Sequence, residues 1–168
     1  MSALPSDPVA REAAIRESVR ARWAGLPDSG VVHGRERDAD SLAEYLRLFS
    51  IKDAANGNKT VIRGAMVKLV RPEPLTEDAT GHCMPLRYVY AIEVIYQFED
   101  TRKDGTNSTD SFNALLIRGF EAFKDDAVLG FQNLSNKPVA PTQDAEVVDF
   151  DQVRCHVTAL ELQCEVHD

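Results

Sequence analysis

The stretch Leu86-Arg-Tyr-Val-Tyr-Ala-Ile-Glu-Val-Ile-Tyr-Gln-Phe-Glu99 decides the fold of this chain. Every second side chain from Leu86 to Phe98 is apolar or aromatic, and all the polar side chains of the stretch occupy the alternate positions. Such alternation predicts a β-strand with one buried face. Because the stretch is longer than most strands, we expect it to protrude from the body of its domain.

Two further stretches predict long strands. Residues 60–71 are rich in Val, Ile, Met and Leu, and residues 153–166 alternate apolar with polar side chains. In the latter, the apolar positions change from odd to even at Ala159-Leu160, which predicts a β-bulge or a strand that passes from one packing surface to another. The three prolines in residues 71–85 predict a long loop, and such loops are often functional.

Three helices are expected. Asp7-Pro8 forms a helix start, and the helix runs to about Gly25 with a narrow apolar stripe. Ser41 and Glu44 form a capping box for a second helix that reaches Phe49. A third, strongly amphipathic helix is predicted over residues 112–123 and should cover the sheet. Its N-cap is one of Ser108, Thr109 and Asp110, and its apolar face comprises Phe112, Leu115, Leu116, Gly119, Phe120 and Phe123.

The order of these elements predicts an α+β fold. We expect a mostly antiparallel sheet with long protruding strands, packed by one amphipathic helix and accompanied by N-terminal helices. A chain of 168 residues is long enough for one domain with a sizeable core. We therefore expect a single domain over 1–168, in which residues 1–51 form a helical N-terminal extension and residues 59–168 form the sheet-and-helix core.

Composition excludes several classes of protein. The net charge is −8, and residues 104–168 hold 12 acidic but only 4 basic side chains, which disfavours sequence-specific binding to nucleic acid. No apolar run is long enough to span a membrane, and the first 25 residues show no signal peptide, so no membrane partner is expected. Three cysteines do not form a disulfide framework, and a reducing compartment fits best.

No motif in the chain carries catalytic chemistry. Adjacent residues such as Cys155 and His156 point to opposite faces of a strand, so they do not share a zinc ion. Gly57-Asn58-Lys59-Thr60 lacks the glycine that a phosphate-binding loop places directly before its lysine. The acidic residues do not have the spacing of a calcium loop. We therefore expect no catalytic residue, no cofactor and no metal site, and we predict that the chain is not an enzyme.

The layout from Thr60 onward resembles the tail terminator and tail completion proteins of long-tailed bacteriophages. The likeness lies in the strand pair at 60–71 and 86–99, the helix Phe112–Phe123, the acidic residues leading into Leu129-Gly130, and the terminal strand Val153–Val166. It covers about 100 of the 168 residues and rests on the order of elements. Members of that family are small α+β subunits that form a ring on the end of the tail tube.

The resemblance implies a structural virion protein that ends tube polymerisation and joins the tail to the head. It implies a homo-oligomeric ring, a hexamer, whose partners are the tail tube protein and a head–tail connector or neck protein. DNA would pass through without specific binding, and the protein would be located in the virion tail or neck after assembly in the host cytoplasm. A tube subunit and a neck adaptor are neighbouring possibilities.

Two sets of residues are candidates for contacts in such a ring. The loop 71–85 exposes apolar groups, so Leu75, His82 and Met84 are expected at a subunit or tube interface. A cluster of carboxylates before the terminal strand is expected to face the channel and to repel the passing duplex. The cluster comprises Asp144, Glu146, Asp149 and Asp151, and a solvated outer face is the other interpretation of these acids.

A function of a different class stays open. The chain could be a small-molecule-binding protein or an isomerase on a cone-shaped α+β fold, whose helices and curved sheet enclose a pocket. Its lining would come from the apolar face of strand 86–99, and His156 would be the acid or base. The lining residues would be Tyr88, Tyr90, Ile92 and Tyr96.

Overall fold

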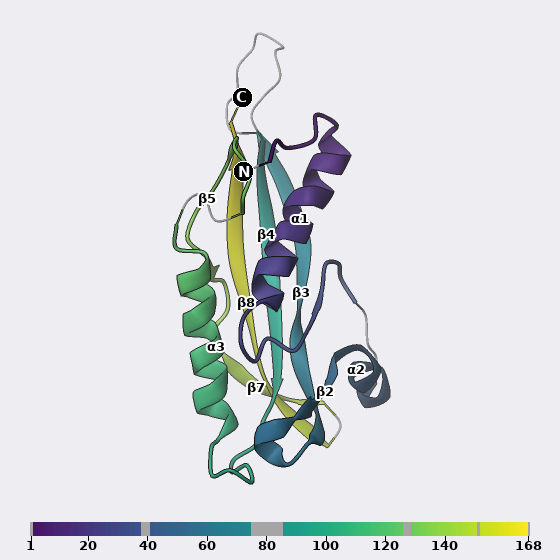
Figure 1. The fold of residues 1–168 in the computed structure, drawn as a ribbon. Helices are drawn as coiled ribbons and strands as arrows, with labels where there is room; N and C mark the ends of the chain where they lie inside the picture. The colour runs from purple at the N-terminus through teal and green to yellow at the C-terminus, as the bar shows by residue number, and fades with distance from the viewer. Residues whose placement is uncertain (1, 38–40, 75–85, 126–128, 151, 168) are drawn as a thin grey trace.

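Three long strands form the centre of the computed structural model, which describes residues 2–37, 41–74, 86–125, 129–150 and 152–167 (Figure 1). They are β3 (Lys59–Pro74), β4 (Leu86–Gln97) and β8 (Val153–Val166). β4 lies in the middle and is antiparallel to both neighbours. The end of the sheet with Pro74 and Leu86 is the upper end in Figure 1. The long strands predicted from alternation are confirmed.

Shorter strands extend this sheet on both sides. β1 (Val31–His33) runs parallel to β3, and β2 (Ser50–Asp53) pairs with β3 in the antiparallel sense before the 3-10 turn η1 (Ala54–Asn56). On the other side β8 pairs antiparallel with three strands: β5 (Leu134–Asn136), β6 (Ala140–Pro141) and β7 (Glu146–Phe150). The predicted α+β fold with a mostly antiparallel sheet is thus confirmed.

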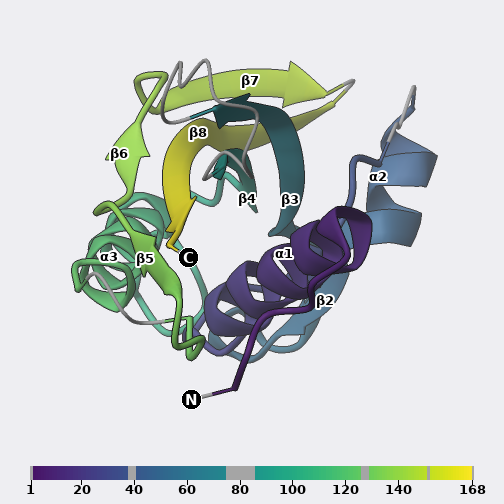
Figure 2. The same ribbon diagram turned by 90° about the horizontal axis from the view of Figure 1, so that it is seen from above.

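The front face of the sheet packs against helices α1 (Pro8–Ala24) and α3 (Ser108–Ala122), and the sheet curls toward them (Figure 2). The buried side chains form rows across the three long strands, such as Val67–Ile92–Leu160 and Leu69–Tyr90–Leu162. The helices add Ile15, Val19, Trp23, Phe112 and Leu115 to the same cluster. α1 therefore belongs to the core of the front face, and the division of the chain at residues 51 and 59 stays a prediction.

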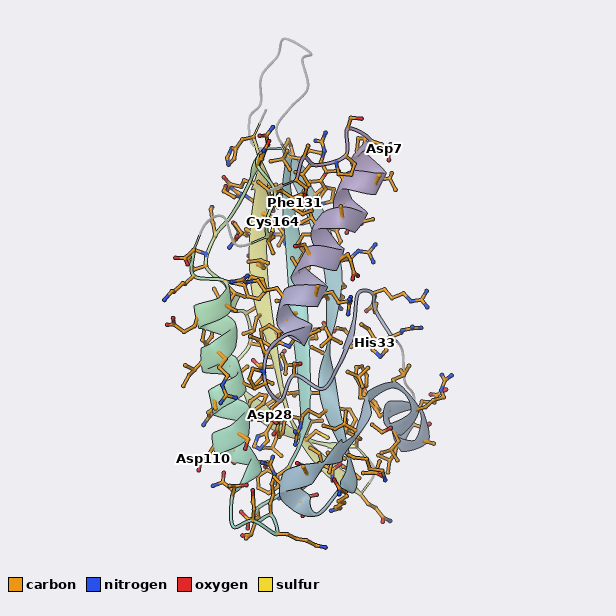
Figure 3. The ribbon with its side chains drawn as sticks, in the orientation of Figure 1. Asp7, Asp28, His33, Asp110, Phe131 and Cys164 are labelled. Carbon is orange, nitrogen blue, oxygen red and sulfur yellow. The ribbon has the colours of Figure 1, made fainter. Side chains whose placement is uncertain are left out.

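Side-chain caps fix the helix starts. Asp7 accepts a hydrogen bond from the Ala10 N–H at 2.8 Å, and Ser41 caps α2 (Leu42–Phe49), as predicted. The cap of α3 is Asn107, whose Oδ1 accepts from the Asp110 N–H at 2.8 Å, so the predicted choice among Ser108, Thr109 and Asp110 is wrong by one residue. Asp7 caps the start of α1, and Asp110 lies in the first turn of α3. Figure 3 labels these two residues at opposite ends of the molecule, so α1 and α3 run in opposite directions.

The predicted β-bulge at Ala159-Leu160 is not present. The alternative prediction, a strand that passes from one packing surface to another, is confirmed. The pairing of β8 with β4 is continuous from Cys155 to Glu165. The upper part of β8 buries its even positions under the front helices, and its lower part also buries Cys155 on the back face. A smaller cluster of Phe49, Ile62, Ile95 and Cys155 lies there. The apolar phase changes because the strand serves two packing surfaces.

The prediction of a loop over residues 71–85 is wrong for its first four residues, and residues 75–85 lie outside the described part of the chain. Arg71, Pro72, Glu73 and Pro74 belong to β3 and pair with β4, beyond a register shift between Leu69 and Arg71. Pro fits there because β1 and β2 pair with β3 only at residues 59–66, which leaves the upper part of β3 as an edge. On α3 the predicted burial of Phe120 is only partial, because Phe112, Leu115 and Phe123 occupy the buried side.

Buried charges hold the lower end together. Arg63 lies between two carboxylates, with its Nη1 3.0 Å from Asp28 Oδ1 and its Nη2 2.9 Å from Asp53 Oδ2. Arg102 lies 3.4 Å from the same Asp53 oxygen and donates to the Tyr96 hydroxyl at 2.8 Å. Each buried cation thus has an anionic partner, which offsets its cost of desolvation.

Candidate functional site

The structure places only part of the residues predicted at a subunit contact or channel. Leu75, His82 and Met84 lie outside the described residues, as does Asp151. Asp144, Glu146 and Asp149 are exposed on and beside β7, at the lower end of the sheet. Asp149 lies 3.3 Å from Arg154, a surface pair that contributes little to stability. All three acids are exposed, but Glu146 and Asp149 are an odd number of residues apart on β7, so their side chains point to opposite faces of that strand.

The pocket predicted beneath Tyr88, Tyr90, Ile92 and Tyr96 is not present at that place. All four side chains are buried in the front-face cluster, where α1 and α3 fill the space above them. The placement of the pocket is therefore corrected: the periodicity identified the buried face of β4 but did not show that helices pack directly on it.

His156 forms a buried pair with the first residue of α3. Its Nε2 lies 3.2 Å from Ser108 Oγ, and that oxygen also accepts a hydrogen bond from the Glu99 N–H at 2.8 Å. The ring lies 5.0 Å from that of Phe112 and 5.1 Å from that of Phe98, measured between centroids. Burial lowers the pKa of His156. Both members are buried, and their contact joins β8 to the start of α3.

Two of the three cysteines lie within the described residues, whereas Cys83 lies outside them. Cys155 and Cys164 are buried and free, and burial raises the pKa of each thiol to about 12. A thiol with so high a pKa is almost wholly protonated at neutral pH. Among the residues that the structure describes, no group of three or more His, Cys, Asp or Glu side chains could hold a metal ion.

The upper end of the molecule carries an apolar groove, which we call the upper groove. It measures about 330 Å³ and lies between the start of α1 and the upper ends of β3 and β4. Its lining comprises Pro8, Val9, Glu12, Leu69, Pro72, Leu86 and Tyr88. Val9 is 77% exposed, so a large apolar side chain of the lining faces water here.

Tyr88 gives this groove a polar group without a partner. The tyrosine is 3% exposed, and among the described residues its buried hydroxyl has no hydrogen-bond partner. An unpaired buried hydroxyl is costly, whereas an acceptor supplied from outside would remove that cost. Burial also raises the pKa of Tyr88, so the group is a neutral donor. The upper groove therefore combines apolar surface with one hydrogen-bond donor.

Sequence reasoning missed the upper groove for two reasons. It brings together α1 and β3, which lie far apart in the sequence, and no local pattern predicts that contact. Val70 is exposed because the register shift between Leu69 and Arg71 interrupts its pairing, and no local pattern predicts where a strand shifts its register. The adjacent apolar residues Leu69 and Val70 were the available signal, because a regular half-buried strand does not place apolar groups on both faces.

A second cavity, the back-face pocket, lies on the opposite side of the sheet. It measures about 210 Å³ and lies between α2, β7 and the lower part of the three long strands. Tyr45 and Phe49 of α2 and Phe150 of β7 contribute aromatic rings to it. The sequence did not indicate this pocket, because Phe150 ends a short strand that the periodicity does not resolve.

Comparisons with known proteins leave these sites to be interpreted from their geometry. A scan with protein-family models and a search of curated proteins both returned no match to this chain. No helix within the described residues has the length and apolar character needed to cross a membrane.

Proposed function

We propose that this chain is a structural subunit that assembles head to tail into a ring, as the resemblance to phage tail terminator and tail completion proteins implies. The observation that carries the proposal is the upper groove, with exposed Val9 beside the unpartnered hydroxyl of Tyr88. Apolar surface of this kind is typical of the centre of a protein interface. The occupant that we propose is a second copy of the chain.

A head-to-tail contact pairs the groove of one subunit with a different surface of the next. The exposed Ile117, on the outer side of α3, is our candidate for that second surface. It is 62% exposed, and α3 lies on the opposite flank of the molecule from α1 (Figure 2). Because the two patches differ, the association is heterologous and closes into a ring when the rotation permits. The resemblance sets the number of subunits at six.

In this proposal the ring has a structural role only. One face would match the last layer of the tail tube protein and stop its growth, and the other would bind the head–tail connector or neck protein. The protein would act in the virion, after assembly in the host cytoplasm, and it would catalyse nothing. Asp144, Glu146 and Asp149 would face the channel and repel DNA, which would pass without specific binding.

The mass of the purified protein tests this proposal. We expect size-exclusion chromatography with light scattering to give a closed oligomer of six copies, and negative-stain microscopy to show rings that cap tail tubes at one end. A monomer at every concentration, with no binding to tubes, would overturn the proposal. Changing Asp144, Glu146 and Asp149 to Lys should leave the ring assembled but slow genome ejection. Normal ejection from assembled particles would place these acids on the outside.

The small-molecule-binding protein or isomerase stays an alternative. Tyr90, Ile92 and Tyr96 lie in the filled core of the front face, and of the predicted lining residues Tyr88 alone borders a cavity, the upper groove. The back-face pocket supports the binding of a small molecule, although it contains none of the residues predicted for that role.

A further inference from the structure

The back-face pocket has a floor built from two rows of the sheet. One row is Met66–Glu93–Ala159 and the next is Gly64–Ile95–Val157. Gly64 leaves room for the ring of Phe49, since a Cβ at position 64 would lie 2.6 Å from Phe49 Cδ1. The absence of a side chain there lets α2 approach the sheet and form one wall of the pocket.

Aromatic side chains form the walls above this floor. The rings of Tyr45 and Phe150 are 4.5 Å apart between centroids, and those of Tyr45 and Phe49 are 6.3 Å apart. They bring together α2 and β7, which are distant in the sequence. Most of the lining is apolar, and Glu93 is its one charged side chain. Such a lining suits a ligand with an apolar body and a single charged group.

Charged side chains of both signs surround the pocket. Lys68 Nζ lies 2.8 Å from Glu93 Oε1 and 3.1 Å from Glu36 Oε1, so one ammonium contacts two carboxylates. Glu161 stands opposite Ala91, one row above Glu93, and interacts electrostatically with Arg71. The Arg37 N–H donates to Met66 Sδ of the lining at 3.2 Å. Within the lining itself the Glu93 carboxylate is the one charged group, so the pocket favours a cation over an anion.

We propose that the back-face pocket binds an organic cation, an amine carried on an apolar body. The body lies among Tyr45, Phe49 and Phe150, and the ammonium lies at Glu93. Aromatic rings and a carboxylate both stabilise an ammonium group. A bare metal ion does not suit the site, because its lining offers a single carboxylate and mostly apolar surface. This inference is independent of ring assembly.

Calorimetric titration of the full chain tests the proposal with three probes of one shape. Phenylbutylamine is the cation, phenylbutanol the neutral analogue and phenylbutyrate the anion. We expect the amine to bind about tenfold more tightly than the alcohol, and the acid more weakly than both. Equal binding of amine and alcohol, or binding of none of the three, would overturn the proposal. The titration reads binding whether or not the protein forms rings.

Two variants assign the binding to this pocket. Glu93→Gln should reduce the preference for amine over alcohol to less than about twofold and leave the binding of the alcohol unchanged, which also shows that the pocket is intact. Glu121→Gln on α3 makes the same change of charge on the other face and should keep the full preference. Ala159→Leu should fill the pocket and abolish binding of amine and alcohol alike. Retention of the preference in Glu93→Gln, or of binding in a folded Ala159→Leu protein, contradicts the assignment.

Discussion

Gly119 of α3 lies directly against the indole ring of Trp23 of α1, and a Cβ at position 119 would lie 2.5 Å from Trp23 Cζ3. The contact joins the two front helices near their C-terminal ends, and the indole is fully buried. No side chain but hydrogen fits at this position, because the ring cannot move away from a close-packed core.

Gly119→Ala should therefore destabilise the protein, although alanine is the better helix former. We expect a loss of about 1–3 kcal/mol in the free energy of unfolding, measured by denaturant titration. Gly25→Ala is the control, since a Cβ there has its nearest contact at 3.5 Å and φ is −75°. A neutral or stabilising Gly119→Ala would show that the two helices do not pack this closely.

Phe112 and Phe120 should differ in their contribution to stability. Phe112 is 1% exposed, so Phe112→Ala should cost about 3–5 kcal/mol. Phe120 is only partly buried and should cost less than half of that on truncation to Ala. Thermal and denaturant unfolding of the two variants measures the difference. Equal losses would mean that α3 is rotated relative to the sheet.

Substitutions in the upper groove and at Ile117 of α3 should block assembly without unfolding the subunit. Val9→Lys and Ile117→Lys each change a side chain that is more than half exposed, so the melting temperature should stay near that of the parent. Each variant alone should be monomeric, and an equimolar mixture should form dimers, because one intact groove and one intact Ile117 remain. Lys52→Glu on β2, at the lower end of the molecule, is the control that still assembles. Light scattering gives the masses, and rings from Val9→Lys would remove the groove from the interface.

Tyr88→Phe separates folding from assembly. Because the hydroxyl has no described partner in the isolated chain, its removal should leave the free energy of unfolding unchanged or raise it by up to about 1 kcal/mol. The association constant of the ring should fall about tenfold, since the bond that a neighbouring subunit supplies is lost. A destabilised monomer with unchanged assembly would mean that the hydroxyl is bonded within the subunit.

Acidification should destabilise the fold through His156. Its folded-state pKa lies below the ordinary value of 6.5 because the ring is buried, so the neutral form is favoured in the native state. The contribution to stability is present above pH 6.5 and is lost as the pH falls through the lower, folded-state pKa. His156→Phe should flatten the fall in stability below about pH 6.5. A profile unchanged by the substitution would assign the dependence to another group.

Local patterns in the sequence were enough to predict the long strands and the helices. The alternation of residues 86–98 and the capping residues Asp7 and Ser41 act within a few neighbours, so the tertiary fold had little to override. Asn107 was missed because four successive capping residues compete there, and backbone geometry decides among them.

The sites depend on contacts that no local pattern records. The upper groove needs α1 against β3, and the back-face pocket needs α2 against β7. The tyrosines of β4 could line a pocket or a core, and only the placement of α1 and α3 decides between the two. Asp144, Glu146 and Asp149 are exposed, and their predicted place in an assembly stays a prediction, because it depends on partners.

The position of β8 affects how the protein is made. β8 is the last described strand to be synthesised, yet it lies inside the sheet, with β4 along one edge and β5, β6 and β7 along the other. Until residues 153–166 leave the ribosome, β4 presents an open edge and its row of tyrosines lacks the neighbouring strand. We therefore expect the sheet to close only after translation of β8. Nascent chains that stop short of it should aggregate or depend on a chaperone.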